Sequence, residues 1–204
     1  MMHLSRTDID AMEHLYKINL INSISGYKPA NLIATKSQDN ITNVAVFSSV
    51  VHYGSSPAIL GFVCRPTTVM RNTYINIKDT GFYTINAINE SIIEDAHHTS
   101  AKYSSEISEF DKTDLSPEYK NEFYAPFVAE SPLKIGMKFL EEYHIKANNT
   151  ILVLGEITDL YFKESMLSED GFLNLSNQKV AAINGLDTYM VAEKYKRLSY
   201  QRPK

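Results

Sequence analysis

The chain reads GYKPANLIATKSQDNITNVAVFSSVVHYGSSPAILGFVCRPTTVMRNTYINIKDTGFYTIN between Gly26 and Asn86. Apolar segments with the character of β-strands alternate here with clusters of small hydroxyl, amide and basic residues. Hydroxyls and backbone N–H groups bind phosphate, and strand ends offer N–H and C=O groups to the edge of a ring. The stretch therefore predicts a β structure whose strand ends can hold a flat ligand that carries phosphate.

The apolar segments of this stretch predict four strands, at residues 30–35, 43–50, 58–64 and 82–86. Residues 133–140 alternate apolar and polar positions, as a strand with one wet face does, and residues 144–147 are predicted to continue that strand after a turn. Residues 150–162 are apolar and β-branched and predict another strand. Gly155, inside it, predicts a bulge or a close approach of two backbones.

Helices are predicted at residues 5–20, 72–79, 91–101 and 116–122. Ser5 or Thr7 can cap the first of them, and Gly81 is predicted to end the second, from which Ile75 and Ile77 would point inward. Several short strands with few helices indicate a mainly β fold, a closed or half-closed β-barrel with helical additions. We expect one domain over residues 1–204, with the N-terminal helix at about 5–20 and the barrel at about 26–198, where residues 189–198 close the chain.

The composition is that of a soluble globular protein, with 44% apolar and 22% charged residues. A formal net charge of −4 argues against nucleic acid as a partner. No run of about 18 apolar residues is present, so no membrane span is predicted. Cys64 is the single cysteine, which excludes an intramolecular disulfide and fits a reducing, cytoplasmic location.

The histidines do not form a pattern typical of a metal site. His97 and His98 are adjacent on a predicted helix and would point to different faces, so they cannot readily share a metal ion. We therefore predict no metal. The chain also lacks G-x-G-x-x-G, which leaves a Rossmann nucleotide domain unsupported.

Short motifs follow one another in a fixed order along the chain. They are Ala34-Thr35-Lys36, Asn43-Val44-Ala45-Val46-Phe47-Ser48, the strand from Pro57 to Phe62, Arg71-Asn72-Thr73-Tyr74-Ile75-Asn76-Ile77, the strand from Thr80 to Asn86, Glu109-Phe110, Glu130-Ser131-Pro132 and Gly155-Glu156-Ile157. Their order and spacing resemble the flavin reductase-like family, whose fold is the FMN-binding split β-barrel. The resemblance covers roughly residues 20–203. Two features depart from the family pattern: Val46 stands where many members have proline, and residues 53–56 form a loop particular to this chain.

The resemblance implies that FMN lies along the strand ends. Ser48 and Ser49 would bind the phosphate and the ribityl chain, and Arg71 and Thr73 would hold the phosphate dianion. Asn72 lies at a helix start and would add a backbone N–H. Thr35, Asn43 and Ala45 would face the ring and its polar edge, and Phe47 would form a wall of the cavity. Val44, in the same segment, completes the expected site.

The function implied by the resemblance is that of an FMN-binding oxidoreductase, most simply a flavin reductase that passes a hydride from NADH or NADPH to flavin. The alternative is a flavoredoxin-like electron carrier, which holds FMN and exchanges electrons with a redox protein without nicotinamide turnover of its own. A third hypothesis, a split barrel without flavin, is disfavoured by Ser48, Arg71 and Thr73. Because family members are usually homodimers, we expect a homodimer, in which His97 or Tyr103 could approach the flavin from a loop or from the second subunit.

Overall fold

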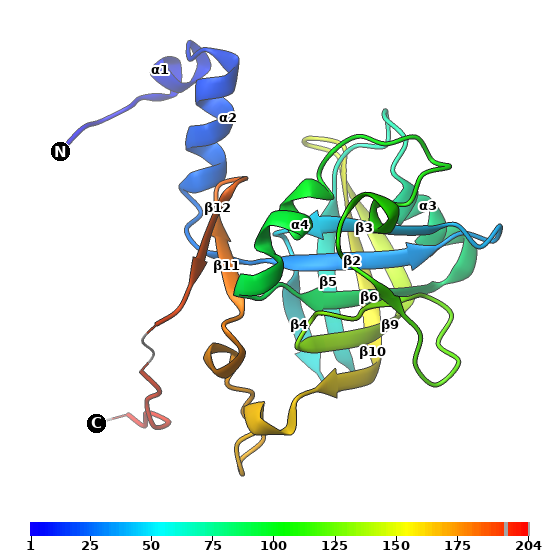
Figure 1. Cartoon of the computed structure of the whole chain (residues 1–204). Helices are drawn as coiled ribbons and strands as arrows, with labels where there is room; N and C mark the ends of the chain where they lie inside the picture. The colour runs from blue at the N-terminus through cyan, green and yellow to red at the C-terminus, as the bar shows by residue number, and fades with distance from the viewer. Residues whose placement is uncertain (194–195, 204) are drawn as a thin grey trace.

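A seven-stranded antiparallel sheet dominates the computed structural model, which describes residues 1–193 and 196–203 (Figure 1). Its spatial order is β3-β2-β6-β9-β10-β5-β4, so that two strands consecutive in sequence, β3 and β4, form the two edges. The sheet curls into a half-closed barrel, as the alternating strand pattern predicts. Its strands are β2 (Asn31–Lys36), β3 (Thr42–Phe47), β4 (Val51–Ser55), β5 (Ala58–Cys64), β6 (Phe82–Ala87), β9 (Leu133–Ile145) and β10 (Thr150–Phe162).

The short connection between β3 and β4 is bonded to β5 by one hydroxyl group. Ser49 Oγ accepts a hydrogen bond from the backbone N–H of Val63 at 3.0 Å and donates one to the carbonyl of Val63 at 3.3 Å. These bonds satisfy backbone groups of β5 beyond Gly61, where the pairing of β5 with β4 ends. The Ser49 side chain therefore helps to close the barrel where its two edges approach.

The hydrophobic core has two parts, and β2 lies between them. Leu32 and Ala34 point into an outer cluster with Val44 of β3, whereas Ile33 points into an inner cluster with Phe62 of β5. Because successive side chains of a strand point to opposite faces, a strand buried on both sides needs an unbroken apolar run. The outer cluster is covered by the helical elements α4 (Ile93–His98) and η2 (Glu109–Lys112), and the inner cluster by α3 (Asn72–Thr80).

The N-terminal arm consists of two helices, α1 (Arg6–Asp10) and α2 (His14–Ser23), and α2 stands apart from the barrel (Figure 1). A three-stranded sheet, with the order β1-β11-β12, lies next to the end of the arm (Figure 1). Its strands are β1 (Lys28–Pro29), β11 (Ala181–Asn184) and β12 (Thr188–Val191). The other short elements are η1 (Glu90–Ile92), β7 (Pro117–Glu118), β8 (Phe127–Val128), η3 (Glu164–Met166) and η4 (Leu175–Gln178). Among the described residues, no helix is long and apolar enough to cross a membrane.

Two helix predictions were wrong. Residues 5–20 do not form one helix, because the Glu13 carboxylate accepts the N–H groups of Leu15 and Tyr16 and so begins a second helix; Ser5 caps the first, as predicted. Residues 116–122 are not helical, since β7 pairs with β8. Asn121 and Glu122 also have positive φ values of 47° and 60°, which a right-handed helix excludes.

The predicted strands at 58–64 and 150–162 are confirmed, whereas two other strand predictions were wrong in extent, and one predicted loop was wrong. The strand predicted at 43–50 ends at Phe47, and a separate strand, β4, begins at Val51. The strand predicted at 133–140 continues without a turn to Ile145, because β10 pairs with its whole length. Residues 53–56 are not simply a loop, since β4 runs to Ser55 and pairs with β5.

The remaining predictions concern α3 and the end of the chain. Gly81 ends α3 in the left-handed conformation, with φ of 78°, as predicted. Ile77 is fully buried, but Ile75 is 40% exposed, because positions two apart on a helix face different sides. Of the closing segment predicted at 189–198, β12 accounts for the beginning, and residues 194–195 lie outside the described residues.

Candidate functional site

The N-terminus of α3 lies beside the strands that carry most of the expected site. Arg71 precedes the helix in an extended conformation, and its carbonyl accepts the first helical hydrogen bond, from Ile75 N at 3.0 Å. Within the part of the chain that the structure describes, α3 has no side-chain cap. The N–H groups of its first turn and the positive end of its dipole are therefore arranged as an anion would need them.

Two buried hydrogen bonds fix the start of α3 against the sheet. Asn43 of β3 donates from Nδ2 to Thr73 Oγ1 at 3.0 Å, and Asn76 donates from Nδ2 to Thr35 Oγ1 of β2, also at 3.0 Å. All four side chains are buried. Since a buried polar group costs free energy unless it is paired, these bonds favour one seating of α3 on the two strands. The sequence placed three of these residues in the site and did not identify Asn76.

The other expected residues divide between exposed and internal positions. Ser48, Arg71 and Asn72 are partly exposed, and Arg71 Nε donates to the carbonyl of Pro66 at 3.5 Å. Phe47 lies edge-on to Phe62 with ring centroids 5.1 Å apart. Ala45 and Ser49 are also partly exposed, and the Ser49 hydroxyl bonds to the backbone of Val63. Val44, by contrast, is fully buried in the outer core cluster.

Glu109, which served only as a sequence landmark, has a direct role at the edge strand. Its Oε2 accepts the backbone N–H of Val44 at 3.1 Å, between Asn43 and Ala45 of the expected site. Burial raises the pKa of the Glu109 carboxyl above its ordinary value, although the N–H of Val44 acts in the opposite direction. The carboxyl lies 65 positions from Val44 in sequence, so local patterns could not have identified this contact.

We expect Glu109→Gln to make the protein more stable at pH 7 and to reduce the pH dependence of its stability. An acid whose pKa is raised in the folded state stabilises the fold below its unfolded pKa and loses that contribution as pH rises through the folded pKa. Glutamine keeps an oxygen for Val44 N–H and carries no charge. The measurement is the free energy of unfolding in urea from pH 4 to pH 8. If the free energies of unfolding of wild type and variant differ by the same amount at every pH, burial does not raise the pKa of the Glu109 carboxyl.

A second polar cluster ties α3 to β9. Tyr74 Oη lies 3.1 Å from each carboxylate oxygen of Glu142, and Lys78 Nζ lies 3.2 Å from Oε2. Burial opposes ionisation of Glu142, but Lys78 and Tyr74 together lower its pKa. Cys64 lies nearby, and burial raises the pKa of its thiol, which makes it a poor nucleophile.

Each histidine of α4 lies close to a tyrosine hydroxyl. His97 Nδ1 lies 3.3 Å from Tyr189 Oη of β12, and His98 Nε2 lies 2.7 Å from Tyr103 Oη. Among the residues that the structure describes, no three His, Cys, Asp or Glu side chains gather as metal ligands would.

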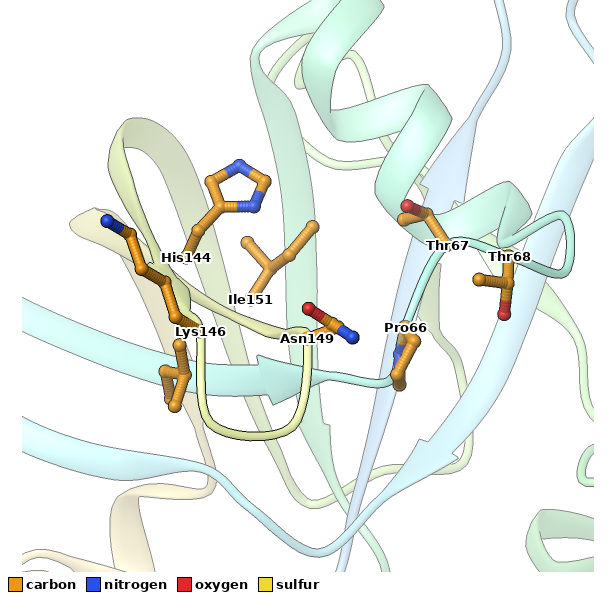
Figure 2. Close-up of a pocket in the computed structure, with 8 residues that line it drawn as sticks. Pro66, Thr67, Thr68, His144, Lys146, Asn149 and Ile151 are labelled. Atoms are coloured by element: carbon orange, nitrogen blue, oxygen red, sulfur yellow. The ribbon is translucent and has the colours of Figure 1, made fainter.

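Two cavities of the described residues stand out, and neither of these two is lined by the residues expected to bind FMN. A cavity of 330 Å³ lies between the turn joining β9 to β10 and the loop after β5, as Figure 2 shows. A more apolar cavity of 480 Å³ lies between the barrel and the three-stranded sheet.

Comparison with known proteins agrees with this architecture. The family model described as "Flavin reductase like domain" matches residues 27–184, and the chain belongs to this family. A split-barrel protein from Shewanella frigidimarina NCIMB 400, assigned as a flavin reductase, is 45% identical and has a TM-score of 0.95, covering 98% of this chain and 100% of its own.

Two more distant structures share the fold. Flavoredoxin of Desulfovibrio vulgaris (Miyazaki F) is 21% identical with a TM-score of 0.73, covering 85% of this chain and 91% of its own. An FMN-binding protein from Thermus thermophilus is 13% identical with a TM-score of 0.71, covering 86% and 93%. The fold is thus the split barrel, as the sequence motifs predicted.

Proposed function

We propose that the chain binds FMN at the N-terminus of α3 and acts as a flavin reductase that takes hydride from NADH or NADPH. The observation that carries the proposal is the uncapped start of α3, preceded by Arg71 and held on β2 and β3 by buried hydrogen bonds. A phosphate dianion placed there would meet backbone N–H groups, the helix dipole and a guanidinium. Membership of the flavin reductase-like family supports the choice of a flavin.

Some residues of the site would contact FMN, and others would hold α3 in position. Arg71 and the N–H groups of Asn72 and Thr73 would hold the phosphate, and Ser48, at the end of β3, would bind the phosphate or the ribityl chain. Thr35 and Asn43 would act through their bonds to α3, because both side chains are buried. Bound FMN would supply the hydride-accepting chemistry, and the protein would supply its orientation.

The first test is an absorbance spectrum of the purified protein after addition of FMN and desalting. Retained flavin bands support the site, and consumption of NADH or NADPH with free FMN as acceptor supports the reductase. A protein that retains FMN without oxidising either nicotinamide would instead be a flavoredoxin-like electron carrier with a redox protein partner. A protein that neither retains FMN nor binds it in titration contradicts both functions.

We also propose that the chain forms a homodimer through its N-terminal arm. Apolar residues point in several directions around α2, yet none is buried; Leu15 is 65% exposed and Ile24 is 68% exposed. A helix that is apolar around much of its circumference is normally covered by protein, and a second copy can supply such cover.

The mass in solution tests this assignment. We expect twice the chain mass by sedimentation equilibrium, and the mass of one chain after the paired change Leu15→Glu and Ile24→Glu, because each carboxylate would be buried in the interface. Far-ultraviolet circular dichroism of the variant should keep the β signal of the barrel. A dimer that persists in the paired variant would place the interface elsewhere.

A further inference from the structure

The cavity between the turn joining β9 to β10 and the loop after β5 has the lining of an anion site. Figure 2 shows His144, Lys146 and Asn149 on the side of the turn and Pro66, Thr67 and Thr68 on the side of the loop. Its volume of 330 Å³ lies within the range of about 300–1,000 Å³ that is usual for small-molecule sites. It is separate from the residues proposed to bind FMN.

The chemistry of the lining suits a nucleoside phosphate. Lys146 provides a positive charge, Thr67 and Thr68 provide hydroxyl donors, and Asn149 provides an amide, all of which can bind phosphate oxygens. Ile145, 38% exposed, offers an apolar surface for a base or a ribose. No acidic side chain lines this cavity among the described residues.

The wall formed by the turn is well defined. Asn148 Oδ1 accepts hydrogen bonds from Thr150 N at 3.2 Å and from Thr150 Oγ1 at 2.7 Å, and Asn149 has a positive φ of 57°. His144 Nε2 lies 3.4 Å from Glu142 Oε1, within the cluster that also holds Tyr74. Such local bonds organise the wall before a ligand arrives, which lowers the entropy cost of binding.

The other wall leads directly to the proposed FMN site. Pro66 lines the cavity, and its carbonyl accepts a hydrogen bond from Arg71 Nε. Arg71 in turn directly precedes α3. Five peptide units separate Pro66 from Arg71, so their Cα atoms lie at most about 19 Å apart. One loop therefore borders the cavity with its first residues and the proposed phosphate site with its last.

We propose that this cavity binds the adenylate end of a dinucleotide whose flavin or nicotinamide end lies at the proposed FMN site. The inference rests on the proposed function for the position of the second end. FAD and NAD(P)H share the adenylate chemistry, and a dinucleotide would bridge two neighbouring sites by linking two weaker contacts in one molecule. Lys146 would pair with the phosphate of the adenylate half.

The direct test is calorimetric titration of 5′-AMP into the FMN-saturated protein. We expect saturable binding that weakens roughly tenfold in Lys146→Glu, since a charge-assisted contact is replaced by repulsion. Lys138→Glu is the matched control, because Lys138 is exposed on β9, the strand that leads into the turn of Lys146, and does not line the cavity. It should leave AMP affinity within about twofold. Absence of AMP binding, or equal effects of the two changes, overturns the proposal.

Two further arms distinguish the source of the adenylate. If it belongs to FAD, the wild type binds FAD more tightly than FMN and Lys146→Glu removes that advantage. If it belongs to the nicotinamide donor, Lys146→Glu raises the KM for NADH or NADPH and leaves the Kd of FMN unchanged. AMP binding with no change in either arm overturns the dinucleotide assignment. If the wild type does not bind FMN but the FMN-free protein binds AMP, the proposed function is refuted. The cavity would then remain a nucleotide site.

Discussion

Arg71→Ala is expected to weaken FMN binding by about 10- to 100-fold, because a charge-assisted hydrogen bond contributes roughly 1.5–3 kcal/mol and each 1.4 kcal/mol is tenfold in affinity. Arg71 is placed for this contact directly before the uncapped first turn of α3. The measurement is the Kd of FMN from quenching of flavin fluorescence. Arg71→Lys should bind FMN with an affinity between those of wild type and Arg71→Ala, since lysine keeps the charge and lacks the planar guanidinium group.

Arg65→Ala is the matched control for this change. Arg65 is exposed on the same loop, and removal of its charge should alter FMN affinity by less than about threefold in physiological salt. Riboflavin, which lacks the phosphate, should bind wild type and Arg71→Ala equally. If Arg71→Ala binds FMN as tightly as wild type, or if riboflavin is affected as strongly as FMN, the phosphate does not lie at the start of α3.

The sequence predicted the class of fold because its strands carry strong local patterns. The strand of residues 150–162 is β-branched and apolar, and it has the same bounds in the structure as in the prediction. Residues 133–140 were only the more buried part of a longer strand, since the continuation to Ile145 is mostly exposed and has a weaker apolar pattern. The two helices of residues 5–20 depended on one capping carboxylate, that of Glu13, whose effect a periodic pattern does not show.

The hydrogen bonds among the residues of the candidate site could not be predicted from the sequence. Asn43 and Thr73 were both assigned to the ligand, yet they bond each other across 30 positions of sequence. The bond from Val44 to Glu109 spans 65 positions. Such pairs depend on the register of β2 with β3 and on the seating of α3, which are set by tertiary packing. A motif therefore names the residues near a site without saying which of them touch a ligand.

Gly155 occupies a place in the barrel where a larger residue cannot fit. It lies at a register shift between β9 and β10, as the sequence predicted for a glycine inside a strand. A Cβ atom there would overlap Tyr83 Oη and lie 3.0 Å from both Tyr83 Cζ and the carbonyl oxygen of Lys138. Tyr83 is fully buried, and its hydroxyl has no hydrogen-bond partner among the described residues.

Gly155→Ala should therefore destabilise the protein by about 3 kcal/mol, at the upper end of the cost of overpacking a core. Tyr83→Phe alone should change the free energy of unfolding by less than about 1 kcal/mol, because the hydroxyl that it removes is buried and unpaired. In the Tyr83→Phe background the alanine should cost at least about 1 kcal/mol less, which a double-mutant cycle measured by urea unfolding reports as coupling. Part of the cost should remain, since the ring carbon and the Lys138 carbonyl are still close. Equal costs in both backgrounds would show that the strand shifts to admit the methyl group and that Tyr83 does not hold it in place.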